Sequence, residues 1–151
     1  MVIRLVTSKS KVAPIKQVTI PRLELCAAVL FTKLMTRVIS ALKLNVNNVF
    51  FWSDSTIVLA WLKKKSCCMK TFVANRVAVV QEMTEVWQWH HVLSKQNPAD
   101  LISRGADPVK LQLCELWWCG PPFLLQPVMT KCQDIPEESE KIVSSRIKSP
   151  V

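Results

Sequence analysis

The chain has 151 residues, half of them hydrophobic, which is enough for one modest domain with a buried core. Its uninterrupted apolar runs, such as LCAAVLF, fall far short of the roughly 18 residues of a membrane span, so no membrane association is expected. The net charge is +9, and residues 1–81 hold thirteen Lys and Arg but two acids, which favours a polyanionic partner such as nucleic acid, although cations also keep an apolar chain soluble.

The N-terminal part of the chain predicts a strand, a long helix and a second strand. The short apolar stretch Val2–Val6 is typical of a strand. A helix is expected from Pro21 to about Leu42, because Thr19 can cap it and Pro21 suits its first turn. The uniformly apolar stretch Val49–Trp52 is typical of a central or parallel strand that is covered on both faces. The apolar spacing predicts that the long helix turns one set of residues inward: Leu23, Ala27, Leu30, Leu34, Val38 and Ala41.

Two further helices, a strand and a short helix are predicted for residues 56–105. Thr56–Lys64 reads as a helix that Asp54 or Ser55 can cap. Residues 70–85 have a helical pattern, and residues 86–92, VWQWHHV, alternate like a strand. Asn97 and Pro98 mark the start of a short helix. The expected inward side of the 70–85 helix consists of Phe72, Arg76, Val77 and Val80.

The periodic pattern ends after Gly105. The next stretch, CELWWCGPPFLLQPV, is aromatic and rich in Pro, and the tail QDIPEESEKIVSSRIKSP has the composition of a disordered segment. We therefore expect a domain at residues 1–106, and an irregular linker with a disordered tail at residues 107–151. The order of the elements predicts an α/β fold with a mixed sheet.

The cysteines indicate a compartment rather than a site. The chain contains six Cys, with no CxxC pair and no His at zinc-finger spacing. This pattern is typical of reduced thiols in an intracellular protein, either cytoplasmic or nuclear.

Three carboxylates lie at the ends of predicted elements. Asp54 follows a buried strand, Glu24 begins the preceding helix, and Asp100 begins the last short helix. If the fold brings them together, a hard cation such as Mg²⁺ or Mn²⁺ would relieve their mutual repulsion, and such a site serves phosphodiester hydrolysis. Each residue also has an ordinary structural explanation, because Glu24 suits a helix dipole and Asp54 and Asp100 suit helix caps.

Four segments of the chain carry a family resemblance. TIPRLELCAAVL, FFWSDSTIVLAWL, KTFVANRVAVVQEMT and HHVLSKQNPADLISRG resemble, in order and spacing, the ribonuclease H region of BEL/Pao-type retrotransposon polyproteins. The segment ELWWCGPPFL resembles the linker that leads toward the integrase in those polyproteins. The resemblance implies a ribonuclease H-like mixed sheet with flanking helices, and cleavage of the RNA strand of RNA–DNA hybrids. It also implies that Glu24, Asp54 and Asp100 bind Mg²⁺ or Mn²⁺, and that the reverse transcriptase and integrase parts of the polyprotein are partners.

The chain departs from the family pattern at its beginning. The family carries its first metal-binding aspartate on the first strand, whereas residues 1–23 contain no Asp or Glu. We therefore expect Val2–Val6 to correspond to the third strand, with the first two strands missing and the domain incomplete. Without the first-strand aspartate, we expect this chain to be inactive in hybrid cleavage.

A nucleic-acid interface is predicted around the helix that follows Asp54. Its predicted contacts are Ser55, Lys63, Lys64, Lys65 and Lys95. Lysines at a helix C-terminus are also favoured by the helix dipole alone, so both explanations stay open for the three consecutive lysines.

His90 and His91 are expected to pack beside a strand. Two alternatives to the ribonuclease function stay open. The chain is either a nucleic-acid-binding module without catalysis or a transposon relic without a stable fold.

Overall fold

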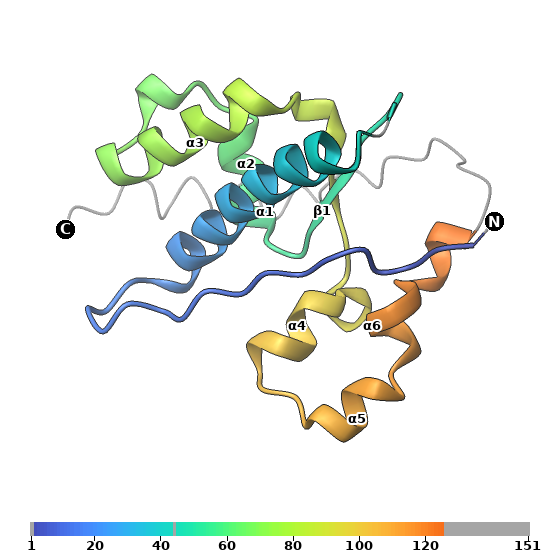
Figure 1. The fold of residues 1–151 in the computed structure, drawn as a ribbon. Helices are drawn as coiled ribbons and strands as arrows, with labels where there is room; N and C mark the ends of the chain where they lie inside the picture. The colour runs from blue at the N-terminus through green and yellow to red at the C-terminus, as the bar shows by residue number, and fades with distance from the viewer. Residues whose placement is uncertain (1, 44, 126–151) are drawn as a thin grey trace. The chain divides into compact units, whose positions relative to one another are not determined.

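The computed structural model describes residues 2–43 and 45–125, which form two compact units. Within the described residues, one unit is built from residues 12–91, and the other combines residues 2–11 with residues 92–125. The described residues contain six α-helices and one small parallel sheet of two strands (Figure 1). The fold is therefore mixed α/β, as the sequence predicts.

The long helix of residues 12–91 forms where the sequence predicts it. Helix α1 spans Ile20–Leu42 and has Pro21 within its first two positions, where the fixed φ of proline suits a helix start. Thr19 occupies the cap position in an extended conformation, although its side chain makes no capping hydrogen bond. The C-cap of the helix is Lys43, which adopts the left-handed conformation with a φ of 50°.

Helix α1 does not bury the face that its spacing predicts. Its buried residues are Leu25, Ala28 and Thr32, and Met35 packs against the same core. Ala27, which belongs to the predicted face, is exposed. The prediction was wrong because α1 is apolar around most of its circumference, so spacing alone does not select the side that meets the core.

Helix α1 passes a test for membrane-spanning helices that rests on length and composition only. Its 23 residues, with a mean hydropathy of 1.7 over its most apolar window, are long and apolar enough to cross a bilayer by length and composition. Only 17% of that window is buried. Core helices and signal sequences pass the same test, so the expected lack of membrane contact stays a prediction.

The sheet joins two short parallel strands from distant parts of the chain. Strand β1, Phe51–Ser53, pairs in parallel with β2, Trp89–His91, and Phe51 lies opposite Trp89. The parallel pairing of the 49–52 stretch is as predicted, but both strands are shorter than their apolar runs. Val86–Gln88, expected to be part of the second strand, forms a 3₁₀ turn instead.

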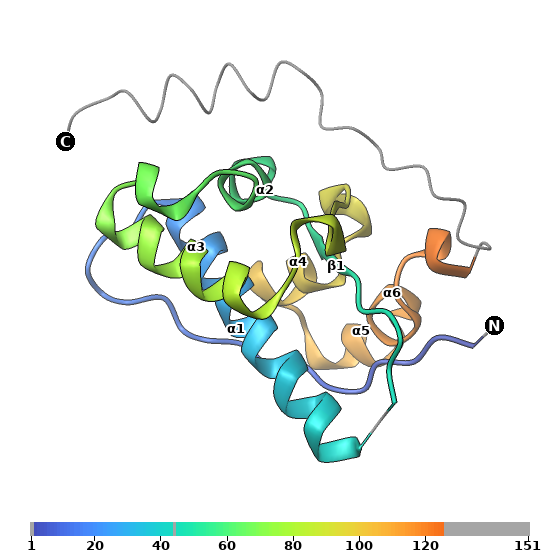
Figure 2. The same cartoon turned by 90° about the horizontal axis from the view of Figure 1, so that it is seen from above.

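Three helices share one hydrophobic core with the sheet of residues 12–91. Helix α2 spans Thr56–Leu62, a 3₁₀ turn follows at Ser66–Cys68, and α3 spans Thr71–Met83. Helices α1 and α3 lie side by side in both views (Figures 1 and 2). The core of this unit consists of Leu25, Ala28, Phe51, Val58, Leu59, Leu62, Val73, Val77, Val80 and Trp89.

Aromatic rings connect the sheet to α1 at the centre of this core. The Phe51 ring stacks on Trp89 with centroids 4.8 Å apart, and meets Phe31 of α1 edge-on at 5.2 Å. The Trp89 indole N–H donates to the Thr84 hydroxyl at 2.9 Å, which satisfies the polar edge of the buried ring. These contacts fix β1 against the helical layer.

Residues 92–125 contain more regular structure than the sequence predicts. After a 3₁₀ turn at Ser94–Gln96, α4 spans Pro98–Ser103, in agreement with the predicted short helix. The expected irregular linker contains α5, Pro108–Gln112, and α6, Glu115–Cys119, followed by a 3₁₀ turn at Pro122–Leu125. The domain boundary at residue 106 stays a prediction, and the tail from residue 126 lies outside the described residues.

The predicted strand Val2–Val6 is not a strand. Its residues form no sheet pairing, and the backbone contact of Leu5 is a single N–H donated to the Trp118 carbonyl at 2.9 Å. A strand exists only when a neighbour completes its hydrogen-bond ladder, so β propensity without a paired strand leaves this stretch irregular.

Candidate functional site

The junction between β1 and α2 connects two of the predicted site residues. Asp54 follows the last residue of β1, and Ser55 is the N-cap of α2. The Ser55 hydroxyl accepts from the Val58 amide at 3.3 Å and donates to Glu24 Oε2 of α1 at 2.6 Å. The fold therefore brings the α1 carboxylate into contact with the residue that follows Asp54, across 31 residues of sequence.

The position of Glu24 weakens its ordinary structural explanation. Helix α1 begins at Ile20 and has no acid in its first turn, so Glu24 lies beyond the region where the helix dipole favours a carboxylate most. Its side chain is half-buried and receives the Ser55 hydroxyl at the short distance typical of hydroxyl-to-carboxylate bonds. Tertiary contact, rather than helix position, therefore accounts for this carboxylate.

Asp54 is not the helix cap that one explanation of the sequence assigns to it. Ser55 performs that role, since its side chain accepts the Val58 amide. Asp54 is half-buried, and among the described residues its carboxylate forms neither a hydrogen bond nor an ion pair. A half-buried carboxylate without such a partner is available to a ligand or to solvent.

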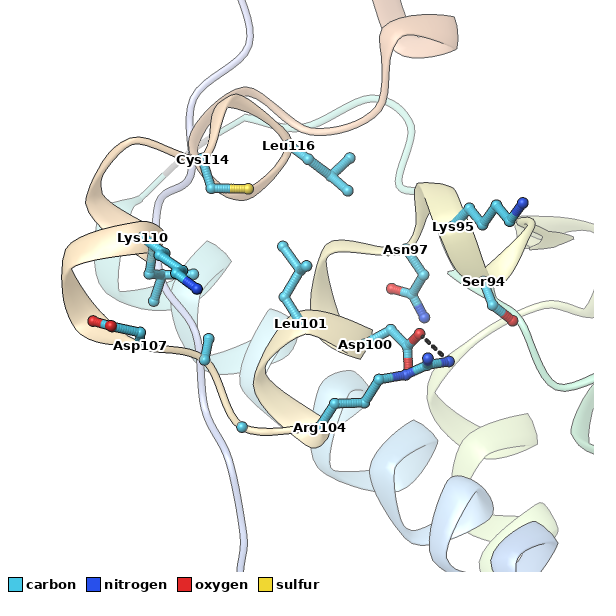
Figure 3. Close-up of a pocket in the computed structure, with 13 residues that line it drawn as sticks. Ser94, Lys95, Asn97, Asp100, Leu101, Arg104, Asp107, Lys110, Cys114 and Leu116 are labelled. Carbon is cyan, nitrogen blue, oxygen red and sulfur yellow. Dashed lines mark ion pairs between the residues drawn. The ribbon is translucent and has the colours of Figure 1, made fainter.

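Asp100 belongs to the other unit and is satisfied by its own helix. Its Oδ2 atom lies 2.8 Å from an Arg104 guanidinium nitrogen, and its Oδ1 atom accepts from the Ser103 hydroxyl at 3.2 Å. Asn97 caps α4 by accepting the Ala99 amide, so the cap role that one explanation of the sequence gives to Asp100 belongs to Asn97. Figure 3 shows this ion pair at the wall of a pocket of about 640 Å³.

The metal centre that the resemblance implies stays a prediction, because its three carboxylates belong to two different units. No group of three or more His, Cys, Asp and Glu in the described part of the chain is placed to hold a metal ion. Glu24 and Asp54 lie at the β1–α2 junction, whereas both oxygens of Asp100 are already in contact with Ser103 and Arg104. No hydrolytic step through a metal follows from this arrangement.

The predicted nucleic-acid contacts differ in their accessibility. Ser55 is 6% exposed, and its hydroxyl makes two contacts within the protein. The lysines at positions 63–65 are exposed, and Gln81 of α3 anchors their backbone by donating to the Leu62 and Lys64 carbonyls at 2.9 and 2.8 Å. Lys95 is exposed in the other unit. The consecutive lysines are thus three charges on a backbone that is held in place.

His90 of β2 lies among aromatic rings. Its ring centroid is 5.7 Å from that of Phe50 and 5.8 Å from that of Trp52. Burial lowers the pKa of His90 from its usual value of 6.5, because the charged imidazolium loses water there. This environment agrees with the predicted packing role.

Replacing Ser55 by Ala should destabilise the chain by about 2–3 kcal/mol. The variant loses both the cap of α2 and the hydrogen bond that satisfies the Glu24 carboxylate, which is the larger loss because a charged acceptor is left without its donor. Urea unfolding followed by circular dichroism measures the difference in the free energy of unfolding.

Ser55→Thr is the matched control, because threonine keeps a hydroxyl that can both cap and donate. We expect it to retain more than half of the stability that Ser55→Ala loses. Equal losses in the two variants would show that the hydroxyl contacts contribute little.

One comparison with known proteins finds a family that part of the chain resembles. Residues 1–55 match the family model of the Pao retrotransposon-like RNaseH-like domain, a range that contains Glu24 and Asp54. Neither a curated protein nor a solved structure matches the chain. Residues 1–55 of this 151-residue chain are therefore similar to a ribonuclease H-like domain of the Pao retrotransposon type.

Proposed function

We propose that residues 12–91 bind the phosphate backbone of RNA–DNA hybrids without cleaving them, as a fragment of a retrotransposon polyprotein. The observation that carries this proposal is the excess of cations in this unit, which has ten Lys and Arg against four Asp and Glu. Basic surfaces of this kind attract polyanions and bind them largely by releasing counterions.

Few of these cations are neutralised within the protein. The ion pair between Arg104 and Asp100 belongs to the other unit. Apart from Lys70, the cations of residues 12–91 form no ion pair with any carboxylate that the structure describes. Their charge is therefore available to a partner, and the family match makes an RNA–DNA hybrid the natural polyanion to test.

The proposal assigns binding rather than hydrolysis because of the carboxylates. The resemblance expects Glu24, Asp54 and Asp100 to share Mg²⁺ or Mn²⁺, but both oxygens of Asp100 already contact Ser103 and Arg104. Hydrolysis is the second candidate, and the Ser55–Glu24 contact favours it by bringing one carboxylate to the end of β1.

The setting of this function follows from the family. We propose that the chain acts inside the cell, in the cytoplasm or the nucleus, where a retroelement makes its RNA–DNA hybrids. Its proposed protein partners are the reverse transcriptase and integrase parts of the same polyprotein. All five Cys within the described residues are free thiols, which is compatible with a reducing compartment.

The proposal predicts hybrid binding that weakens steeply with salt. Fluorescence anisotropy of a labelled RNA–DNA hybrid should show an affinity loss of at least about tenfold between about 50 and about 200 mM salt. Binding that ignores salt, or a chain without a cooperative thermal transition, would contradict the proposal.

The same samples test cleavage. We expect neither the parent chain nor Asp54→Asn to cut the hybrid when Mg²⁺ or Mn²⁺ is added. Cutting by the parent chain that is lost in Asp54→Asn would replace the binding proposal with the hydrolytic one.

A further inference from the structure

Two arginines from neighbouring helices meet at one aromatic ring. The Arg76 guanidinium of α3 lies 3.5 Å from the centroid of the Phe72 ring, and the Arg22 guanidinium of α1 lies 5.2 Å from the same centroid. Both arginines are half-buried. We call these three residues the arginine cluster.

The two guanidinium groups are held differently. Arg76 is fixed by Nε–H donation to Cys26 Sγ at 3.2 Å and by donation from its terminal nitrogen to the Phe72 carbonyl at 2.9 Å. The Arg22 side chain makes no hydrogen bond to a described residue, so the Phe72 ring is its recorded contact. Arg76 is therefore preorganised, whereas Arg22 keeps all its N–H donors for a ligand.

The arginine cluster lacks a counter-charge. Neither arginine forms an ion pair with a carboxylate in the described residues. Two like charges near one ring repel each other, and the ring face offsets that repulsion only in part. An anion bound at either guanidinium group would reduce this repulsion.

We infer that the arginine cluster binds a phosphate group of the nucleic-acid backbone, in addition to the contacts predicted for the consecutive lysines. A guanidinium matches two phosphate oxygens with parallel N–H donors, which suits arginine better than lysine for this role. The stacking on Phe72 orients the Arg76 plane in advance, so little freedom is lost on binding. This inference rests on the proposed binding of nucleic acid.

The test compares Arg22→Gln with Arg37→Gln by anisotropy of a labelled RNA–DNA hybrid over a range of salt concentrations. Arg37 lies on the same helix and is exposed, so both variants lose one charge from α1. Arg22→Gln should weaken binding about 5- to 10-fold at about 0.1 M salt and lower the salt slope by about one. Arg37→Gln should change the affinity less than threefold. Arg22→Lys should keep the salt slope but not the full affinity, because lysine lacks the paired donors.

Each outcome decides between the proposals. Equal losses in Arg22→Gln and Arg37→Gln, with the parent binding well, would overturn the arginine cluster and leave the binding function intact. A parent chain that binds no hybrid would overturn both. Circular dichroism melting of every variant separates loss of contact from loss of fold, and a lower melting temperature for Arg22→Gln alone would also count against the inference.

Discussion

Replacing Phe51 by Ala is expected to lower the free energy of unfolding by about 3–5 kcal/mol. Phe51 is 3% exposed and is the residue through which β1 contacts both Trp89 and Phe31. Its loss removes apolar burial and leaves a cavity between the sheet and α1, and strands of three residues offer few hydrogen bonds to compensate. Since small domains are stable by only about 5–15 kcal/mol, the variant should lose much of its folded population.

The neighbouring residue supplies the control for this experiment. Phe50→Ala makes the same chemical change one position earlier, on a half-buried ring that contacts Trp87, Trp52 and His90 but does not belong to the core cluster. Urea unfolding should show less than half the loss seen for Phe51→Ala. Similar losses for the two variants would mean that the Phe51 stack does not organise the core.

Local signals in the sequence predicted the helices well. Pro21 has a fixed φ and marks the start of α1 within one residue, and Asn97 with Pro98 marks α4 in the same way. The same signal occurs at Asp107 and Pro108, where the Asp107 carboxylate accepts the Val109 amide at 2.9 Å and α5 begins. The missed helix was thus predictable from an Asp-Pro pair that the lack of apolar periodicity obscured.

Features that depend on distant partners were less predictable. The face of α1 that meets the core is chosen by α3 and the sheet, because the helix offers apolar residues on several sides. Val2–Val6 has the residues of a strand but no paired neighbour, so its propensity is not realised. Both errors have the same cause, which is that burial and pairing are properties of the folded chain and not of a segment.

The candidate site shows the same difference between features that local sequence predicts and contacts that only the folded chain creates. Residue type and position were sufficient to select Glu24 and Asp54, and the fold brings Glu24 to the residue that follows Asp54. The contact runs through Ser55, which the sequence suggested as a nucleic-acid contact and the structure buries. The arginine cluster was not predicted, because Arg22 and Phe72 are 50 positions apart and no sequence motif connects them.

Changing Lys63, Lys64 and Lys65 together to Gln is expected to weaken hybrid binding by about 100- to 1,000-fold at about 0.1 M salt. The reason is the loss of three phosphate contacts, which should lower the salt slope by about 2.7. The lysines are exposed and follow α2 directly, and Gln81 anchors their backbone, so the substitution removes charge without removing core contacts. Anisotropy titrations of the parent and the variant over a range of salt concentrations measure both quantities.

The control removes the same number of charges from α1 and its C-terminal cap, with Lys33, Arg37 and Lys43 changed to Gln. If the three consecutive lysines contact phosphates, their loss should exceed that of the control by at least about tenfold, because distant charges act only through a field that salt screens. Equal losses would mean that hybrid binding depends on the net charge of residues 12–91. The dipole explanation for the lysines predicts a different pattern, in which the triple variant melts at a lower temperature and keeps its affinity.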